Sequence, residues 1–269
     1  MSIRQVRIVL ATIWLLLTWQ PRSEAQAGPW ENCKSGDVET VILDCSVVID
    51  DKSTSQQLLD AAHDNRGVAF AHKGQLDAAI ADFDEAIRLD PRSAVALSNR
   101  GNAYIAKGQF GRSIIDYSEA IRLDPSYDPP YGARGTAYLR AHKYAEALAD
   151  LNEAVRLEPQ SSAVYNNRGD AHLDIGEPAL AIADYSAAIN LNPNSAGVYY
   201  NRSNAYIVTG NVILAIDDLT AFIRLRPNFP ESYYKRGLLY GELGAKDKAA
   251  ADFRKTLELE PSYAPACTL

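Results

Sequence analysis

The chain has 269 residues, of which 47% are hydrophobic, and its 27 basic and 34 acidic residues give a formal net charge of −7. Affinity for a phosphate backbone comes from clustered Lys and Arg, and this acidic chain has no basic stripe. We therefore expect no nucleic-acid partner.

Residues 1–27 have the parts of a cleaved secretory signal peptide. Arg4 and Arg7 precede an apolar run over residues 8–19, and a polar stretch then ends in Ala-Gln-Ala. The run is short for a membrane span, and an A-x-A ending is typical of a cleavage site. We predict cleavage after Ala27, export to the bacterial periplasm or the extracellular space, and no membrane span in the mature chain. A retained membrane anchor is the alternative.

Residues 28–59 are expected to form an amino-terminal cap. Within them, residues 38–50 have the pattern of a degenerate second helix, in which Cys45 aligns with Phe83 of the repeat that follows. Terminal units of a repeat array need an atypical outer face, because no neighbour covers them. The cap is therefore predicted to contain a degenerate half-repeat.

The three cysteines are interpreted in the light of export. Cys33 and Cys45 flank a short segment, and such a pair can form a disulfide in an oxidising compartment. A bond between them would pin the segment before the cap helix to the helix itself. Cys267 is left over, as an inert thiol or an intermolecular bridge.

Six units of 34 residues follow without an insertion. Proline recurs at position 32 of each unit, and small residues recur at positions 8 and 20. This period is typical of stacked helical hairpins, with an apolar stripe along each second helix and a proline to end it. We predict an all-α fold with a short tail at 264–269. The units are 60–93, 94–127, 128–161, 162–195, 196–229 and 230–263.

The landmark residues carry a family resemblance. In the first unit, positions 8, 11, 20, 24, 27 and 32 hold Gly67, Phe70, Ala79, Phe83, Ala86 and Pro91. This pattern resembles the tetratricopeptide repeat family over 204 of the 269 residues. The resemblance implies a right-handed superhelical solenoid, which binds a partner protein or an extended peptide in its concave groove.

One departure from the family is systematic. The family usually has Leu at position 7, whereas every unit here has Arg, and position 23 is Asp in all six units. A lone buried charge would cost several kcal/mol, so we predict that the two series pair. Separate solvated charges are the alternative. The predicted pairs are Arg66 with Asp82, Arg100 with Asp116, Arg134 with Asp150, Arg168 with Asp184, Arg202 with Asp218 and Arg236 with Asp252.

Polar residues recur on the first helices. In the superhelical repeat domain of O-linked N-acetylglucosamine transferase, which these positions resemble, asparagines form a ladder that holds the backbone of an extended peptide. An amide suits that role because it both donates and accepts hydrogen bonds. The alternative is that these amides bond to a neighbouring repeat. The predicted peptide-binding residues are Asn65, Asn99, Asn167, Asn201 and Lys235 at position 6, Asn102 and Asn204 at position 9, and Tyr200 and Tyr234 at position 5.

No pattern in the chain indicates catalysis. The four histidines occupy unrelated repeat positions, and no Cys-x-x-Cys or His-rich spacing indicates a metal site. We predict a binding scaffold without catalytic residues, metal or cofactor. The alternative is a structural or accessory subunit of a cell-envelope complex, which assembles or self-associates through its carboxyl-terminal repeat.

Overall fold

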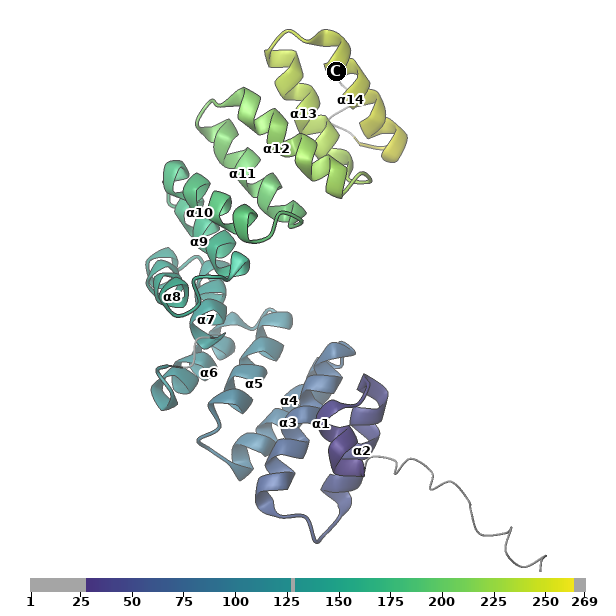
Figure 1. The fold of residues 1–269 in the computed structure, drawn as a ribbon, viewed down its shortest axis with the longest axis vertical. Helices are drawn as coiled ribbons and strands as arrows, with labels where there is room; N and C mark the ends of the chain where they lie inside the picture. Colours follow the sequence, from purple (N-terminus) through teal and green to yellow (C-terminus); the bar gives the residue numbers. More distant parts are fainter. Residues whose placement is uncertain (1–27, 127–128, 264–269) are drawn as a thin grey trace, which may run out of the picture.

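The computed structural model describes residues 28–126 and 129–263 of the chain. The predicted signal peptide and the predicted tail, which contains Cys267, lie outside these residues. The described part forms fourteen α-helices and no strand. The helices pair into hairpins that stack side by side into a curved array (Figure 1). The prediction of an all-α solenoid of helix-turn-helix repeats is confirmed.

The hairpins follow one another in chain order. The first hairpin, ahead of the six repeats, consists of α1 (Pro29–Ser35) and α2 (Val38–Asp50). Ser55 and Ser93 cap the helices that begin repeats 1 and 2, because their side chains accept hydrogen bonds from backbone N–H groups of the first turn. The repeats are formed by α3 (Gln56–His72) and α4 (Leu76–Leu89), α5 (Ala94–Ala106) and α6 (Phe110–Leu123), α7 (Pro129–Arg140) and α8 (Tyr144–Leu157), α9 (Ser162–Asp174) and α10 (Pro178–Leu191), α11 (Ala196–Val208) and α12 (Val212–Leu225), and α13 (Pro230–Glu242) and α14 (Lys246–Leu259).

The turn inside each repeat depends on a residue with positive φ at position 15. Glycine adopts this conformation freely, whereas a Cβ makes it costly. In repeat 3 the residue is His142, with φ of 57°. The glycines at this position are Gly74, Gly108, Gly176, Gly210 and Gly244.

The two helices of a repeat meet where position 8 faces position 24. A Cβ added at Gly169 would lie 2.7 Å from the Tyr185 ring, which is fully buried. Ser203 fits the same place in repeat 5, where Leu219 stands instead of an aromatic ring. The small residue is therefore required by the side chain at position 24.

The predicted pairing of Arg at position 7 with Asp at position 23 is confirmed in all six repeats. In each pair, Nε and Nη2 of the arginine donate to the two carboxylate oxygens over 2.6–2.9 Å. Burial alone would raise the pKa of the Asp82 carboxyl, but hydrogen bonds from Arg66 and His63 hold that pKa below its ordinary value.

Each of these arginines also links two hairpins, which the sequence analysis did not predict. Nη1 of the arginine donates to a side chain on the second helix of the preceding hairpin. The arginine therefore stabilises both its own repeat and the junction before it. The acceptors are Ser46, Asp84, Ser118, Asn152, Ser186 and Thr220.

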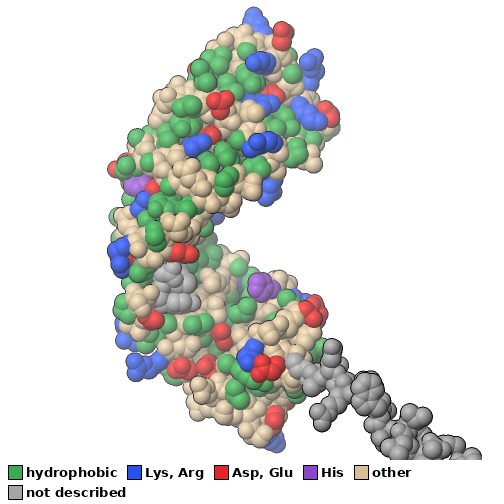
Figure 2. Space-filling model, viewed as in Figure 1, with side chains coloured by type: hydrophobic (Ala, Val, Ile, Leu, Met, Phe, Trp, Pro, Cys, Tyr) green, Lys and Arg blue, Asp and Glu red, His purple; other side chains and the backbone are tan. Residues whose placement is uncertain are grey.

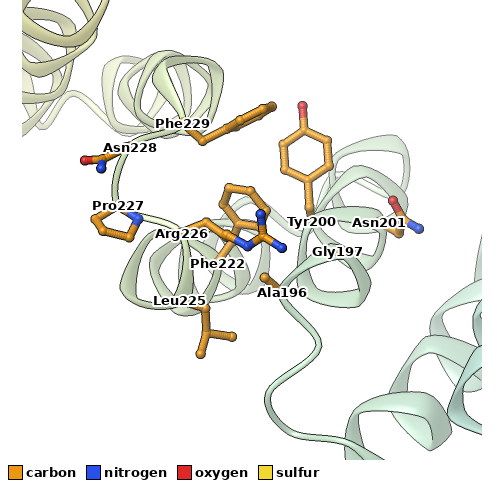
Figure 3. A pocket seen from close by; sticks show the side chains of 10 residues that line it. All are labelled: Ala196, Gly197, Tyr200, Asn201, Phe222, Leu225, Arg226, Pro227, Asn228 and Phe229. Atoms are coloured by element: carbon orange, nitrogen blue, oxygen red, sulfur yellow. The ribbon is translucent and has the colours of Figure 1, made fainter. Parts of the chain in front are cut away.

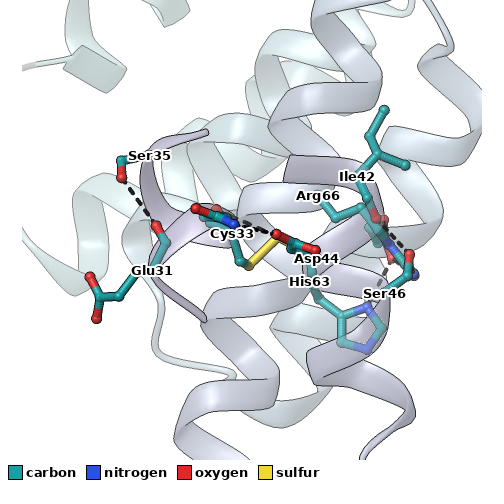
Figure 4. Close-up of a disulfide and its surroundings, with 11 residues drawn as sticks. Glu31, Cys33, Ser35, Ile42, Asp44, Ser46, His63 and Arg66 are labelled. Atoms are coloured by element: carbon teal, nitrogen blue, oxygen red, sulfur yellow. Dashed lines mark hydrogen bonds and ion pairs between the residues drawn. A yellow bond between two sulfur atoms is a disulfide. The ribbon is translucent and has the colours of Figure 1, made fainter. Parts of the chain in front are cut away.

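The amino-terminal cap is a short but complete hairpin, whereas half a repeat was predicted. Helix α1 precedes α2, and Asn32 donates to Asp44 where the later repeats have their Arg–Asp pair. The structure joins Cys33 to Cys45 in a disulfide, at the place where position 8 meets position 24 in the repeats (Figure 4). The cap therefore keeps the repeat's contacts with different chemistry.

Candidate functional site: the concave groove

The first helices of the repeats line the inner side of the curve. Helices α3, α5, α7 and α9 each contact the next first helix along the array, which makes this side the tighter one. Figure 2 shows the hollow that results between the two arms of the molecule. A ligand of the groove would therefore meet side chains from several repeats.

Three pockets lie at successive repeat junctions along this groove. Those formed by repeats 3 and 4 and by repeats 4 and 5 enclose about 250 Å³ and 280 Å³, and the one at the end of repeat 5 encloses about 500 Å³. Asn167 lines the first two pockets, and Asn201 lines the last two. The two predicted asparagines therefore connect the three pockets into a row, which we call the junction row.

A polar pocket of about 580 Å³ lies beside the junction row, and it too is lined by Asn167 and Asn201. On its wall, Asp170 accepts hydrogen bonds from the Tyr185 hydroxyl and from the Asn201 amide at 2.7 and 3.0 Å. Burial raises the pKa of the Asp170 carboxyl, although the hydrogen bond from Tyr185 opposes the shift in part. The Arg140 guanidinium also lines this pocket.

The predicted asparagines bond to the repeat before them. The Asn99 amide donates to Asp64 at 3.0 Å, and the Asn167 amide donates to Thr136 at 2.9 Å. Asn201 does the same with Asp170. The structure thus shows the inter-repeat bonding that the sequence left as the alternative, while the amides still line pockets of the groove.

The other predicted residues are not all brought together. Asn102 accepts from the Tyr117 hydroxyl and lines, with Asn99, a separate pocket of about 350 Å³ between repeats 1 and 2. Asn204 accepts from Lys235 and lines the polar pocket.

Two predicted residues lie apart from these pockets. Asn65 is half-buried on α3 and lines none of them. Tyr234 packs against Phe253 and Tyr263 at the carboxyl-terminal end of the array. The candidate site therefore centres on Asn167, Asn201 and Tyr200.

Comparison with known proteins agrees with this architecture. Tetratricopeptide repeat models match residues 67–108, 94–127, 133–196 and 230–263, which together make up more than half of the chain. The solved structure of MamA is 30% identical over 61% of this chain and 96% of its own, with a TM-score of 0.57. This chain belongs to the tetratricopeptide repeat family. Proteins of the family are generally scaffolds for protein–protein interaction.

Two further solved tetratricopeptide structures share the fold. PilF of Pseudomonas aeruginosa is 20% identical over 79% of this chain and 97% of its own, with a TM-score of 0.70. YrrB is 22% identical over 69% of this chain and 96% of its own, with a TM-score of 0.60. No curated protein sequence matches this chain.

The pocket at the end of repeat 5 departs from the tetratricopeptide pattern. Position 27 is Ala in the family and in repeats 1 to 4, but it is Phe222 in repeat 5. The rings of Tyr200, Phe222 and Phe229 lie with their centroids 5.2–6.0 Å apart and form one wall (Figure 3). We call this cavity the aromatic pocket.

Sequence reasoning missed Phe222, Arg226 and Phe229, all of which line the aromatic pocket. A signal was available, because repeat 5 breaks the internal pattern at position 27 and reverses its charge at position 31. Arg226 occupies that last position, where the other repeats have acids or an amide. These are Asp90, Asp124, Glu158, Asn192 and Glu260.

Over residues 28–126 and 129–263, no helix is long and apolar enough to cross a membrane. In the same part of the chain, no three His, Cys, Asp or Glu side chains are grouped so that they could hold a metal ion. His63 bonds to Asp82, and His172 bonds to Glu177 and lies 3.9 Å from Asp184.

Proposed function

We propose that this chain is an exported scaffold that binds an extended segment of a partner protein along its concave groove. The observation that carries the proposal is the junction row, in which Asn167 and Asn201 connect three pockets. An extended segment would place side chains in successive pockets while amides of the groove met its backbone. The solved structure of YrrB is described as that of a tetratricopeptide protein with an unusual peptide-binding site.

Export is the second part of the proposal. It is supported by the signal-like pattern of residues 1–27 and by the Cys33–Cys45 disulfide, since disulfides persist in oxidising compartments. The intact mass of the protein, purified from the cells that make it, tests both features. We expect a chain that begins at Gly28 and has lost two hydrogens at the cysteine pair. A chain that begins at Met1 with free thiols would contradict export.

The groove is tested by filling it without disturbing the fold. Gly197 is the second residue of α11 and lines two pockets of the junction row, and a Cβ built there meets nothing within 4 Å. Gly197→Gln therefore adds a neutral side chain to the groove. Gly111 is the matched control, because it is the second residue of α6, has the same open surroundings and lines none of these pockets.

The readout is affinity capture of partners from extracts of the source cells. We expect the Gly197→Gln protein to lose partners that the unaltered protein and the Gly111→Gln protein retain. Equal capture by all three proteins would contradict binding in the groove.

Self-association by continued stacking is less well supported. At each junction the side chain at position 25 accepts a hydrogen bond from the arginine of the next repeat, but repeat 6 has Arg254 there. A guanidinium has no acceptor, so an added repeat of the same kind would bring two guanidinium groups together. We therefore favour a groove ligand over assembly through α14.

A further inference from the structure

The aromatic pocket differs from the two other pockets of the junction row in size and in lining. It is nearly twice as large as either, at about 500 Å³ against about 250 and 280 Å³. The pocket of repeats 3 and 4 is lined at position 27 by Ala154 and at position 31 by Glu158. In the aromatic pocket these positions are Phe222 and Arg226. The three pockets are therefore not equivalent binding sites.

Its apolar wall is held in place before any ligand arrives. Phe222 is only 7% exposed, and the Tyr200 hydroxyl donates to Glu231 at 2.6 Å. Burial and this carboxylate raise the pKa of the Tyr200 phenol, so that it stays neutral. Phe229 is 40% exposed and forms the open side of the wall. A large apolar side chain that entered would remove the face of Phe229 from water, which is favourable.

Arg226 supplies a free cation at the same pocket. Figure 3 shows its side chain among the lining residues, with the guanidinium directed into the cavity. Among the residues that the structure describes, no side chain lies within hydrogen-bond or ion-pair distance of this guanidinium. The nearby Lys235 is engaged, because it bonds to Asn204 and Glu231. Arg226 is thus left to pair with a group of the ligand.

We propose that the aromatic pocket binds an aromatic or large aliphatic side chain whose neighbour in the partner segment is a carboxylate, and that the carboxylate pairs with Arg226. A guanidinium binds a carboxylate through two parallel hydrogen bonds, which adds direction to the contact. This inference rests on the proposed groove function and adds the chemistry of the ligand.

The other two pockets of the junction row offer a carboxylate no cation, which would fix the register of that segment. Glu158 lines the pocket of repeats 3 and 4, and the pocket of repeats 4 and 5 has no charged lining residue. A carboxylate would meet like charge in the first and no partner charge in the second, and both lower affinity for wrong alignments. The acidic end of the ligand is therefore directed to repeat 5.

Binding of four labelled peptides to the full-length protein tests the proposal by fluorescence anisotropy. All have the same flexible Gly-Ser frame. The first carries Phe-Asp inside the frame and an amidated end, and the second replaces that Asp with Asn. The third ends in Phe with a free carboxylate, and the fourth replaces the Phe of the first with Ser. The first and third distinguish a side-chain carboxylate from a terminal one.

We expect the Phe-Asp peptide or the Phe-carboxylate peptide to bind at least about tenfold more tightly than the Phe-Asn and Ser-Asp peptides, since tenfold corresponds to about 1.4 kcal/mol. Equal binding of the carboxylate and amide peptides, or no binding of any peptide, would overturn the inference.

Two charge reversals then locate the contact. Arg226→Glu should weaken binding of the carboxylate peptide by about tenfold or more, so that this peptide no longer binds more tightly than the amide peptide. Arg224→Glu makes the same charge change two residues away, at an exposed position outside the pocket, and should change affinity by less than about twofold. Equal losses from both variants would mean that net charge alone is responsible, and would overturn the assignment to Arg226.

Phe222→Ala tests the apolar wall. It restores the alanine that repeats 1 to 4 have at this position, so the fold is expected to be retained. It should reduce the difference in affinity between the Phe-Asp and Ser-Asp peptides. The groove proposal is judged separately, by partner capture with Gly197→Gln. Capture that depends on residue 197 but is unchanged by Arg226→Glu would leave the groove in place and overturn this inference.

Discussion

The arginine–aspartate pairs and the junction row occupy the same repeats, yet the pairs are alike everywhere and the pockets differ. All six pairs have the same two hydrogen bonds, whereas the pocket of repeat 5 alone has Phe222 and Arg226. Every repeat must stack, so what stacking needs is repeated. A side chain that serves one ligand contact has no reason to recur. Within this chain, regular positions indicate stability and irregular ones indicate recognition.

The largest effect is expected from breaking one of the regular pairs. Asp218→Ala leaves the Arg202 guanidinium without its partner, and Arg202 is 18% exposed. We expect the free energy of unfolding in urea to fall by about 3 kcal/mol, because an unpaired, mostly buried charge remains. Asp217→Ala removes an exposed carboxylate beside it and should cost less than about 0.5 kcal/mol. Similar losses from both changes would mean that the pairs do not stabilise the repeats.

A second regular contact is the close approach of position 8 to position 24. Gly169→Ala would place a Cβ 2.7 Å from the Tyr185 ring, and we expect a loss of about 2 kcal/mol from overpacking. Adding Tyr185→Leu should recover part of that loss, since repeat 5 combines Ser203 with Leu219 at these two positions. Urea unfolding of the single and double variants measures this coupling. Additive effects would contradict the assigned contact.

A position that is irregular in its backbone should behave differently, although its side chain lines the polar pocket. His142 has a φ of 57° where five repeats have glycine, so His142→Gly should stabilise the protein by about 1 kcal/mol in thermal or urea unfolding. His142→Ala keeps the Cβ and should give no such gain. A gain from alanine equal to that from glycine would show that the side chain, and not the backbone, is responsible.

The smallest effect concerns pH. Because burial raises the pKa of Asp170, the folded state holds that proton more tightly than the unfolded state does. Ionised Asp170 therefore disfavours folding at neutral pH, and this penalty is removed as the pH falls through the raised pKa. The Asp170→Asn protein should be more stable than the unaltered protein at pH 7. The difference in free energy of unfolding should shrink as the pH falls toward the ordinary pKa range of aspartate. A difference that grows on acidification would contradict the raised pKa.

The sequence predicted most of the features that repeat, although it missed the bond from each arginine to the preceding hairpin. It also missed helix α1 and the aromatic pocket, which each occur once. The fold and the Arg–Asp pairs follow from a fixed period, as does the alignment of Cys45 with Phe83. Helix α1 was missed because it has seven residues, too few to show a helical period, and has Asn32 where the repeats have Arg.

The hydrogen-bond acceptors of the groove amides could not be predicted for a different reason. The residues that accept from them are Asp64 at position 5, Thr136 at position 9 and Asp170 at position 9, so no single spacing identifies the acceptor. Phe222 could have been noticed, since it replaces an alanine of the pattern, but its link to Phe229 depends on the packing of the turn after α12.

Photo-crosslinking in the cells that make the protein tests the central claim most directly. A benzoylphenylalanine placed at Gly197 would lie in the groove, and one placed at Gly111 would lie at the start of α6. We predict a partner adduct from residue 197 that is missing from residue 111. Adducts from residue 111 without any from residue 197 would contradict recognition in the concave groove.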